Sequence, residues 1–360
     1  MKKTLIHSLA ALIAAAAMGT VLASCEKTLS TPSVTDGEFI PEGSSRVTVT
    51  FSEPATKAGT AATTAEKSIN TLQVLVFDKN SKLEAIMTPA IAGDKQSATA
   101  TAVITNGQKY FRAVANGESF PTTVGTTTVG DFDNKVSTLS TNTVSSFVMT
   151  AGASRKILSD DTVALTLNRL CSKVCLTSVL RNYSDADLGE LSLKVTGVWI
   201  NNVAGKINWS AGWGSAAVAV GDQTWYNQFT ASPQHPDLTG LLYDDLTDYT
   251  LAQSGSNTGE HTFYIYSNPA TAVTEGGSWS PRVSRMIVGV QLAGMSKAMY
   301  YAANLPQTDP NKVYNVQLTL QGLPSDNPDT PSTPGSLELS VTASITVSDW
   351  GAATDVPVVL

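Results

Sequence analysis

The sequence predicts an all-β protein with two antiparallel β-sandwich domains, followed by a separate terminal strand. Short apolar stretches alternate with turn residues along most of the chain, which is typical of sandwiches. A repeated pattern of strand, helix and strand does not occur in the sequence. The stretch from Ser336 to Trp350, SLELSVTASITVSDW, alternates between apolar and polar residues, which predicts a strand with one buried face.

The bulk composition limits the classes of function. A length of 360 residues suggests about two domains. Apolar residues make up 42% of the chain, so a sizeable core can form, while charged residues make up only 15%. The net charge is −7, and the sequence beyond the N-terminal signal has no basic run. This argues against nucleic acid or an anionic membrane surface as a partner.

The N-terminus predicts an export signal. Lys2 and Lys3 precede an apolar stretch over residues 5–21, which is too short and too rich in alanine to favour a permanent membrane span. The stretch ends in Leu-Ala-Ser-Cys, which resembles a bacterial lipobox. We expect a signal peptide over residues 1–24 and a lipid on Cys25, which would tether the precursor to a membrane. An ordinary signal peptide with a chance cysteine is the alternative.

A propeptide over residues 25–57 is expected to contain one short strand. The sequence RVTVTFS alternates, so Val47, Val49 and Phe51 share one face. The stretch from Glu53 to Thr71 is small and polar, and we expect it to be exposed and flexible.

Two globular domains are predicted over residues 58–165 and 166–323. Their clearest strands are LQVLVFD, KYFRAVANG, TFYIYSNP, SRMIVGVQL and NKVYNVQLTLQG. The boundary falls within a long β-rich stretch, TVALTLNRLCSKVCLTSVL, and one short helix is expected in NYSDADLGEL. A Pro-rich tether over residues 324–335 leads to the terminal strand segment over residues 336–360.

Cys171 and Cys175 lie in the β-rich stretch, where they are too far apart to pair with each other. Four residues along a strand span roughly 13 Å, whereas a disulfide needs Cα atoms within roughly 7 Å. Their spacing also differs from that of a zinc knuckle. We therefore expect two buried free cysteines.

Few residues offer catalytic or metal-binding chemistry. His235 and His261 are the only histidines beyond the signal, and the sequence lacks a nucleophile elbow and a phosphate-binding loop. Three acidic clusters could hold calcium, but none has EF-hand spacing, and loop solvation explains them as well. The clusters are Asp131 with Asp133, Asp160 with Asp161, and Asp244 and Asp245 with Asp248. The sequence predicts no enzyme, no metal site and no cofactor.

Tryptophans leave a second kind of function open. Trp209, Trp213 and Trp225 lie in loop-like sequence and could stack on sugar rings. Packing in the core or in a subunit interface is the more ordinary role of such side chains.

The order and spacing of these segments resemble FimA-type fimbrillins, the type V pilins of Bacteroidales bacteria. The resemblance is carried by the lipobox, RVTVTFS, LQVLVFD, YFRAVANG, FVMTAG, LNRLCSKVCL, NKVYNVQLTLQG and the terminal SLELSVTASITVSDW. It implies two transthyretin-like β-sandwich domains with a C-terminal donor-strand segment. It also implies export as a lipoprotein, cleavage by a trypsin-like protease and polymerisation by strand exchange.

The implied exchange gives roles to particular residues. Cleavage removes the strand that carries Val47, Val49 and Phe51, and the vacated groove accepts the terminal strand of another copy. Burial of each apolar donor residue would contribute roughly 1–3 kcal/mol. These donor residues are Leu337, Leu339, Val341, Ala343, Ile345 and Val347.

Two basic residues are candidates for the cleavage. A cut after Arg46 would leave residues 47–51 on the mature chain, so the groove would stay filled. A cut between Lys57 and Ala58 removes them, and we predict this bond, with Arg46 as the alternative. Lysine departs from an arginine-specific site, so this prediction requires a protease that accepts lysine.

The sequence thus predicts a structural subunit of a bacterial surface fimbrium that supports adhesion. The expected partners are other copies of the chain, related fimbrial subunits and the processing protease, together with a host or bacterial receptor of unknown identity. The expected location is the outer membrane and the cell-surface fimbrium, with membrane contact only through the precursor lipid. A tip adhesin and a monomeric glycan-binding surface lipoprotein are the alternatives.

Overall fold

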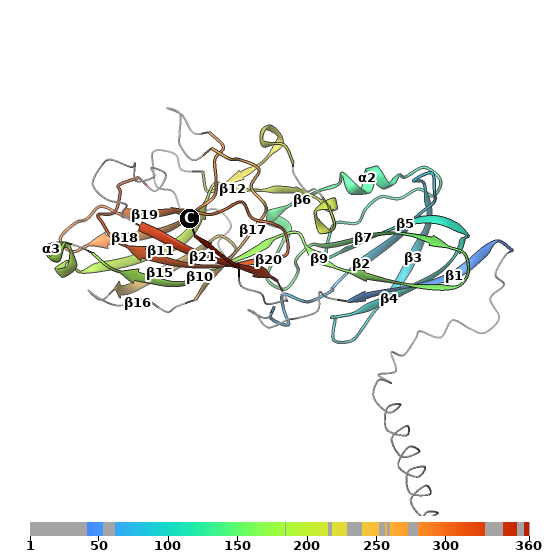
Figure 1. The fold of residues 1–360 in the computed structure, drawn as a ribbon, viewed down its shortest axis with the longest axis horizontal. Coiled ribbons are helices and arrows are strands. Elements are labelled where there is room, and N and C mark those ends of the chain that lie inside the picture. The colour runs from blue at the N-terminus through green and yellow to red at the C-terminus, as the bar shows by residue number, and fades with distance from the viewer. Residues whose placement is uncertain are drawn as a thin grey trace, which may run out of the picture. The chain divides into compact units, whose positions relative to one another are not determined.

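The computed structural model describes most of the chain beyond residue 41 (Figure 1). The described residues are 42–52, 62–183, 185–214, 218–228, 240–251, 256–257, 260–272, 280–327, 341–350 and 356–359. Within these ranges, no helix has the length and apolar character needed to cross a membrane. Several predicted features lie outside the described residues. They are the signal peptide, Cys25, Lys57, Ala58, His235, Leu337, Leu339 and most of the tether.

The N-terminal sandwich consists of one continuous path of eight strands, in the order β8-β1-β4-β3-β2-β5-β7-β9. The long strand β3 turns the corner, since its first half pairs with β2 and its second half with β4. The strands are β1 (Ser44–Ser52), β2 (Leu72–Phe77), β3 (Leu83–Ile91), β4 (Ala98–Thr105), β5 (Gly107–Ala115), β7 (Met149–Ile157), β8 (Asp161–Thr166) and β9 (Asn168–Arg169).

The C-terminal sandwich has two main sheets. One follows the order β16-β10-β20-β21-β22, with β17 also paired to β10, and the other follows β15-β11-β18-β19. The strands are β10 (Ser172–Arg181), β11 (Leu193–Asn201), β15 (Tyr243–Leu251), β16 (Ser256–Asn257), β17 (His261–Ile265), β18 (Arg285–Leu292), β19 (Met299–Asn304), β20 (Lys312–Leu320), β21 (Val341–Asp349) and β22 (Val356–Val359). Among described residues, the chain passes from the first sandwich to the second between β9 and β10.

Small elements connect and cover the sandwiches. They are α2 (Val129–Asp133), β6 (Val136–Thr138), η1 (Leu139–Thr141), α3 (Ala186–Glu190), β12 (Val203–Ala204), β13 (Lys206–Asn208), η2 (Trp209–Gly212), η3 (Val220–Asp222) and β14 (Trp225–Tyr226). Helix α3 confirms the helix expected in NYSDADLGEL. Helix α2 was not anticipated, although Thr128 and Asp131 form a capping box at its N-terminus.

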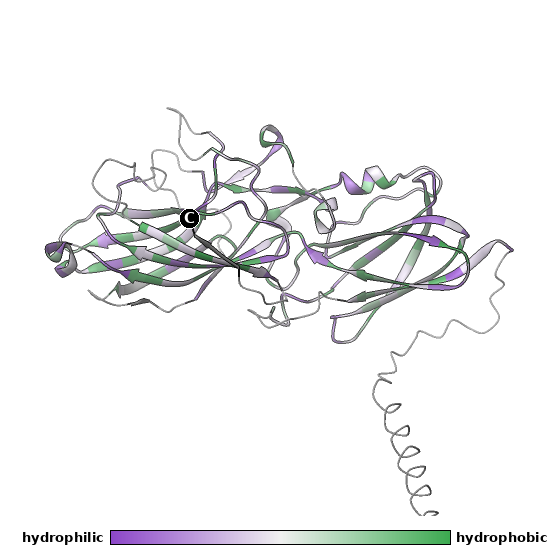
Figure 2. Ribbon diagram, viewed as in Figure 1, coloured by the Kyte–Doolittle hydropathy of each residue, from purple (hydrophilic) through white to green (hydrophobic). Residues whose placement is uncertain are grey.

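Two hydrophobic cores follow from this arrangement. The inside of the N-terminal sandwich holds Val47, Val49 and Phe51 together with residues of β2, β4, β5, β7 and β8. The second core fills the C-terminal sandwich and continues onto the outer face of β2 and β5, where Leu75 and Phe77 belong to it. Figure 2 shows the hydrophobic residues alternating with hydrophilic ones along many of the strands.

The predicted all-β sandwich class is confirmed, but the pairing is not entirely antiparallel. Strand β1 runs parallel to β8, and β10 runs parallel to β20. In both pairs, other strands lie between the partners in the sequence, which provides the long connection that parallel pairing needs.

The expectation that residues 53–71 are exposed is wrong for three of the described residues, whereas Thr63, Thr64, Ala65, Asn70 and Thr71 are exposed. Ala62, Glu66 and Ile69 are 7%, 1% and 1% exposed. The side chain of Glu66 accepts a hydrogen bond from Thr63 N, and Glu66 N donates to Thr63 Oγ1, so a small polar sequence forms a compact turn. Residues 53–61 lie outside the described residues.

Candidate functional site

Strand β1 lies inside the N-terminal sheet, with a partner along each edge. It pairs antiparallel with β4 and parallel with β8. Val49, for example, is opposite Ala100 on one side and Val163 on the other. The side chains of Val47, Val49 and Phe51 are 0%, 0% and 2% exposed, so this strand contributes a full row to the core.

Polar contacts fix the register of β1 at its start. Ser45 Oγ donates to Asn106 Oδ1 at 2.6 Å, and Arg46 N donates to Asp160 Oδ1 at 2.8 Å. Because β1 has two neighbours, its removal would leave a slot bordered by two strand edges, with unpaired backbone groups on both and an apolar floor. Such a slot has the features needed to accept another strand.

The terminal strand β21 lies on its own domain. It pairs antiparallel with β20 along its whole length, from Val341 opposite Leu320 to Asp349 opposite Lys312, and its other edge pairs with β22. Val341 and Ile345 are buried, and Ala343 and Val347 pack partly buried against the same core. The face predicted to fill a groove is therefore the face that packs on the protein's own core in this structure.

The alternation ends at the last residues of β21. Ser348 is buried, and Trp350 is fully buried where the terminal strand reaches the N-terminal sandwich. The Trp350 ring contacts Phe147, which precedes β7, with the ring centroids 5.5 Å apart. Trp350 N donates to Asn311 O at 2.9 Å, which ties the end of β21 to the start of β20.

The two cleavage candidates differ in how the structure presents them. Arg46 lies within β1, opposite Val103 of β4, so its backbone belongs to a paired strand. A protease binds its substrate as an extended segment with free backbone groups, which Arg46 does not offer while β1 is in place. Lys57 and Ala58 lie outside the described residues.

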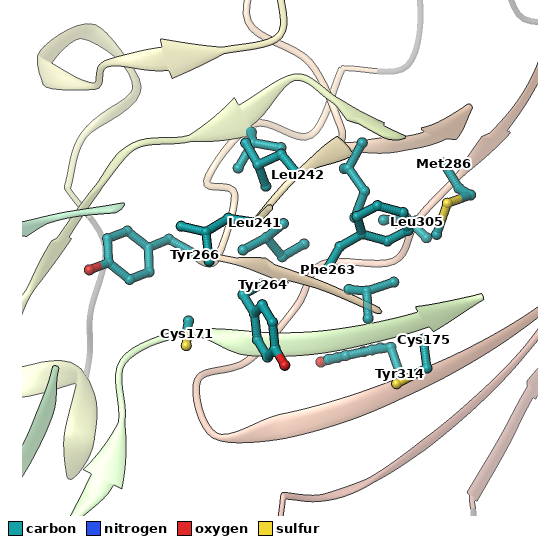
Figure 3. Close-up of a cluster of buried hydrophobic side chains, with 14 of the residues drawn as sticks. Cys171, Cys175, Leu241, Leu242, Phe263, Tyr264, Tyr266, Met286, Leu305 and Tyr314 are labelled. Carbon is teal, nitrogen blue, oxygen red and sulfur yellow. The ribbon is translucent and has the colours of Figure 1, made fainter. Parts of the chain in front are cut away.

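Cys171 and Cys175 are free and buried, as predicted. Burial raises the pKa of the Cys171 thiol to about 12 and that of the Cys175 thiol to about 11, which keeps both protonated and unreactive at neutral pH. Figure 3 shows Cys171 next to the start of β10 and Cys175 farther along it, in the cluster that also contains Tyr264 and Tyr314.

Acidic residues of the proposed clusters have local structural partners. Asp131 caps α2, while Asp133 holds the Arg112 guanidinium at 2.6 and 3.0 Å. The described residues contain no group of three or more histidine, cysteine or acidic side chains that could hold a metal ion.

Three more of these acidic side chains make defined contacts. Asp160 accepts the backbone bond from β1, and Asp161 pairs with Arg155 at 2.7 Å. Asp244 Oδ2 lies 2.6 Å from His261 Nδ1, so this histidine has a carboxylate partner on β15.

Tryptophans proposed for sugar stacking are largely covered. Trp209 is 1% exposed and packs against Phe132, with the ring centroids 4.9 Å apart. The Arg112 guanidinium lies 4.7 Å from the centre of the Trp213 ring, and Gly152 packs so closely on this ring that an added Cβ would lie 2.6 Å from it. Trp225, on β14, is partly buried. These contacts support structural roles for Trp209 and Trp213.

Known proteins match the fold of this chain and part of its sequence. A family model described as the major fimbrial subunit protein (FimA) matches residues 45–168. A search of curated proteins returned no match.

Solved structures extend the likeness of fold to most of the chain. A candidate cell adhesion protein from Parabacteroides distasonis ATCC 8503 is 17% identical with a TM-score of 0.61, covering 86% of this chain and 98% of that one. A candidate cell adhesion protein from Bacteroides eggerthii DSM 20697 is 18% identical with a TM-score of 0.59, covering 87% and 98%. A fimbrilin (FimA) from Porphyromonas gingivalis W83 is 12% identical with a TM-score of 0.59, covering 86% and 98%.

The family match includes β1, the two strands that flank it and the rest of the N-terminal sandwich. Residues 45–168 thus match the model of the major fimbrial subunit protein (FimA), and the chain is similar in fold to a solved fimbrilin.

Proposed function

We propose that this protein is a stalk subunit of a bacterial surface fimbrium that polymerises by exchange of its terminal strand. The observation that supports this most strongly is the position of β1 between β4 and β8, with Val47, Val49 and Phe51 buried. In the proposal, proteolysis removes β1, and the terminal strand of another copy takes its place. A stalk subunit needs both a slot and a donor, and this chain has a candidate for each.

The proposed processing begins with a lipid on Cys25 and export to the outer membrane. A trypsin-like protease then hydrolyses the Lys57–Ala58 bond, leaving a carboxylate on Lys57 and a new amino terminus on Ala58. Everything up to residue 57, including β1, departs with the lipid. The paired backbone of Arg46 supports this choice of bond over a cut in β1.

The proposed donor must leave β20 before it can enter the slot. Four apolar side chains of the donor would move from one apolar environment to another, so the apolar area that they bury changes little. They are Val341, Ala343, Ile345 and Val347. Leu337 and Leu339, which precede the described part of the strand, would add roughly 1–3 kcal/mol each if they became buried. Rigid-body freedom lost on association opposes this gain.

Processing is tested with Lys57→Ala and Arg46→Ala variants of the precursor exposed to a trypsin-like protease. We expect the Lys57→Ala protein to keep β1 and to show no ladder of polymer bands on unboiled gels. The Arg46→Ala protein should be trimmed and should polymerise normally. N-terminal sequencing of the polymer should begin at Ala58. A polymer that begins at Val47 would contradict the proposed site.

Donation is tested by deleting residues 336–360. We expect the deleted protein to be trimmed at Ala58 but to form no ladder unless another copy supplies the strand. Polymer formation by the deleted protein alone would exclude these residues as the donor. Saturable sugar binding by a monomer, lost on changing Trp213 and Trp225, would favour the glycan-binding alternative instead.

A further inference from the structure

The end of the terminal strand and the turn after the proposed cleavage site meet in one buried cluster. We call this cluster the Trp350 joint, and its members come from both sandwiches and from the turn at residues 62–69. They are Glu66, Phe147, Arg169, Lys173, Tyr264 and Trp350. Trp350 directly follows β21, the last long strand described, and its side chain is fully buried.

Three groups enclose the Trp350 ring. The Tyr264 ring stacks on it with centroids 5.7 Å apart and planes at 21°, and the Phe147 ring meets it at 66°. The Arg169 guanidinium lies 4.7 Å from the centre of the Trp350 ring, within the range of a cation–π contact. Arg169 is only 1% exposed, so this contact is shielded from water.

Glu66 positions two of these three groups. Tyr264 Oη donates to Glu66 Oε1 at 2.7 Å, and Arg169 Nε donates to the backbone oxygen of Glu66 at 3.0 Å. Lys173 Nζ lies 3.0 Å from the same carboxylate oxygen. Glu66 is 1% exposed, and a buried carboxylate with these partners holds them in fixed places. The turn thus fixes the site in which Trp350 packs.

Two buried polar atoms near the end of the terminal strand make this arrangement costly. Within the described residues, neither Ser348 Oγ nor Trp350 Nε1 has a hydrogen-bond partner. A buried polar group without a partner lowers stability. The position of the terminal strand is therefore less stable than its apolar packing alone would make it. The contacts of the Trp350 joint then contribute a larger share of the stability that keeps the strand in place.

We propose that Glu66 and Trp350 form a latch that keeps the terminal strand on its own domain, and that Glu66 controls its release. In the uncleaved chain, the turn that contains Glu66 is tethered upstream to β1 and downstream to β2. A cut after Lys57 frees the upstream end, and a segment with a free end has more conformational freedom. Glu66 then leaves its partners more often, Arg169 and Tyr264 lose their support, and Trp350 is released. The coupling to polymerisation rests on the proposed strand exchange, whereas the latch itself does not.

The latch is tested by amide hydrogen exchange in the uncleaved precursor. Glu66→Gln and Trp350→Ala should each speed exchange in β21 by about tenfold, and the double variant should exceed the larger single effect by less than about twofold. Glu84→Gln is the matched control, because Glu84 pairs with buried Lys109 inside the N-terminal sandwich. Its effect should be limited to the strands around Lys109.

A milder variant covers the case in which Glu66→Gln fails to fold. Tyr264→Phe keeps the ring that stacks on Trp350 and removes only the hydroxyl that Glu66 holds, so exchange in β21 should rise by about threefold. The latch is overturned if exchange in β21 stays within about twofold of the unchanged protein in both the Glu66 and Tyr264 variants, or if the Glu66 and Trp350 effects multiply.

Release by cleavage is tested on precursor cut after Lys57 by a lysine-specific protease, with Ala58 confirmed as the new N-terminus. Exchange in β21 should be faster in the cut protein than in the precursor, and equal rates would overturn control by cleavage. Ladders on unboiled gels separate the two proposals. Faster exchange without ladders supports release by cleavage and excludes strand donation, while ladders with unchanged exchange exclude release by cleavage alone.

Discussion

At the scale of single residues, Glu66 combines burial with charge. Burial alone would raise the pKa of its carboxyl, but hydrogen bonds from Tyr264 and Thr63 and the charge of Lys173 outweigh burial and lower it. The ionised form is therefore favoured by the folded structure. Its usual pKa of 4.5 marks the upper end of the pH range in which this contribution disappears.

We expect acid to loosen the terminal strand. A carboxyl whose pKa is lowered on folding stabilises the protein above its unfolded pKa, and this contribution is lost as the pH falls through the folded value. Exchange in β21 of the precursor, corrected for intrinsic rates, should therefore rise below about pH 4.5. The basic residues that face Glu66 are Arg169 and Lys173. The Glu66→Gln precursor should lack this part of the response, and an identical acid response in both proteins would contradict the assignment.

Ser348 offers a change in the opposite direction. Ser348→Ala removes a buried hydroxyl that has no partner in the described structure, so the precursor should gain about 1 kcal/mol in the free energy of unfolding. Chemical denaturation measures this gain. Trimmed Ser348→Ala protein should also polymerise more slowly, because its terminal strand leaves β20 less often. A loss of stability would show that the hydroxyl has a favourable contact.

At the scale of elements, β1 and β8 have buried rows of the same kind but different proposed fates. Val49 and Val163 are opposite each other in the register and are 0% and 3% exposed. Only Val49 lies in the part of the chain that the proposed trimming would remove. Equivalent substitutions in the two strands therefore test whether β1 is removed while β8 is retained.

We expect Val49→Asp and Val163→Asp to harm the precursor equally and the polymer unequally. Each places a charge in the core and should lower the free energy of unfolding of the precursor by roughly 3 kcal/mol or more. After trimming, protein made from the Val49→Asp precursor is identical to the unchanged mature chain, so its polymers should have normal stability. Polymers of Val163→Asp should stay weakened, as thermal dissociation on gels would show. A lasting defect from Val49→Asp would mean that β1 is retained.

How well an element could be predicted from the sequence depended on its pattern. Alternation predicted β1 and the part of the terminal strand that is described, because one face of each packs on a core. Strand β15 was missed, since its acidic residues resemble a loop. The parallel pairing of β1 with β8 joins segments far apart in the chain, which single-strand patterns cannot reveal. Glu66 was missed because its small polar surroundings predict exposure, whereas its side chain bonds to Lys173 and Tyr264 of the C-terminal sandwich.

At the scale of the whole molecule, the two sandwiches share a core. Phe120 and Phe132 of the N-terminal half surround Trp209 of the C-terminal half, with ring centroids 5.8 and 4.9 Å from it. Thr150 Oγ1 donates to Trp209 O at 2.7 Å, and Asn168 Nδ2 donates to Gly212 O at 2.6 Å. Neither half can unfold without exposing apolar surface of the other.

We expect the precursor to unfold in a single cooperative transition. The calorimetric enthalpy should equal the van't Hoff enthalpy, because the shared core couples the halves. Trp209→Ala should lower the stability of this unit by about 3–5 kcal/mol and bring the two halves closer to independent unfolding. Two separate transitions in the unchanged precursor would contradict this coupling.

The parallel pairing of β1 with β8 has a consequence for how a filament would grow. A strand that replaced β1 and kept both ladders would have to run in the direction of β1, since the reverse direction would exchange parallel for antiparallel pairing along each edge. Every junction would then have the same polarity, and subunits would add head to tail. Such a filament has two chemically different ends, one with an empty slot and one with a free strand, so elongation at each end requires a different part of the incoming subunit.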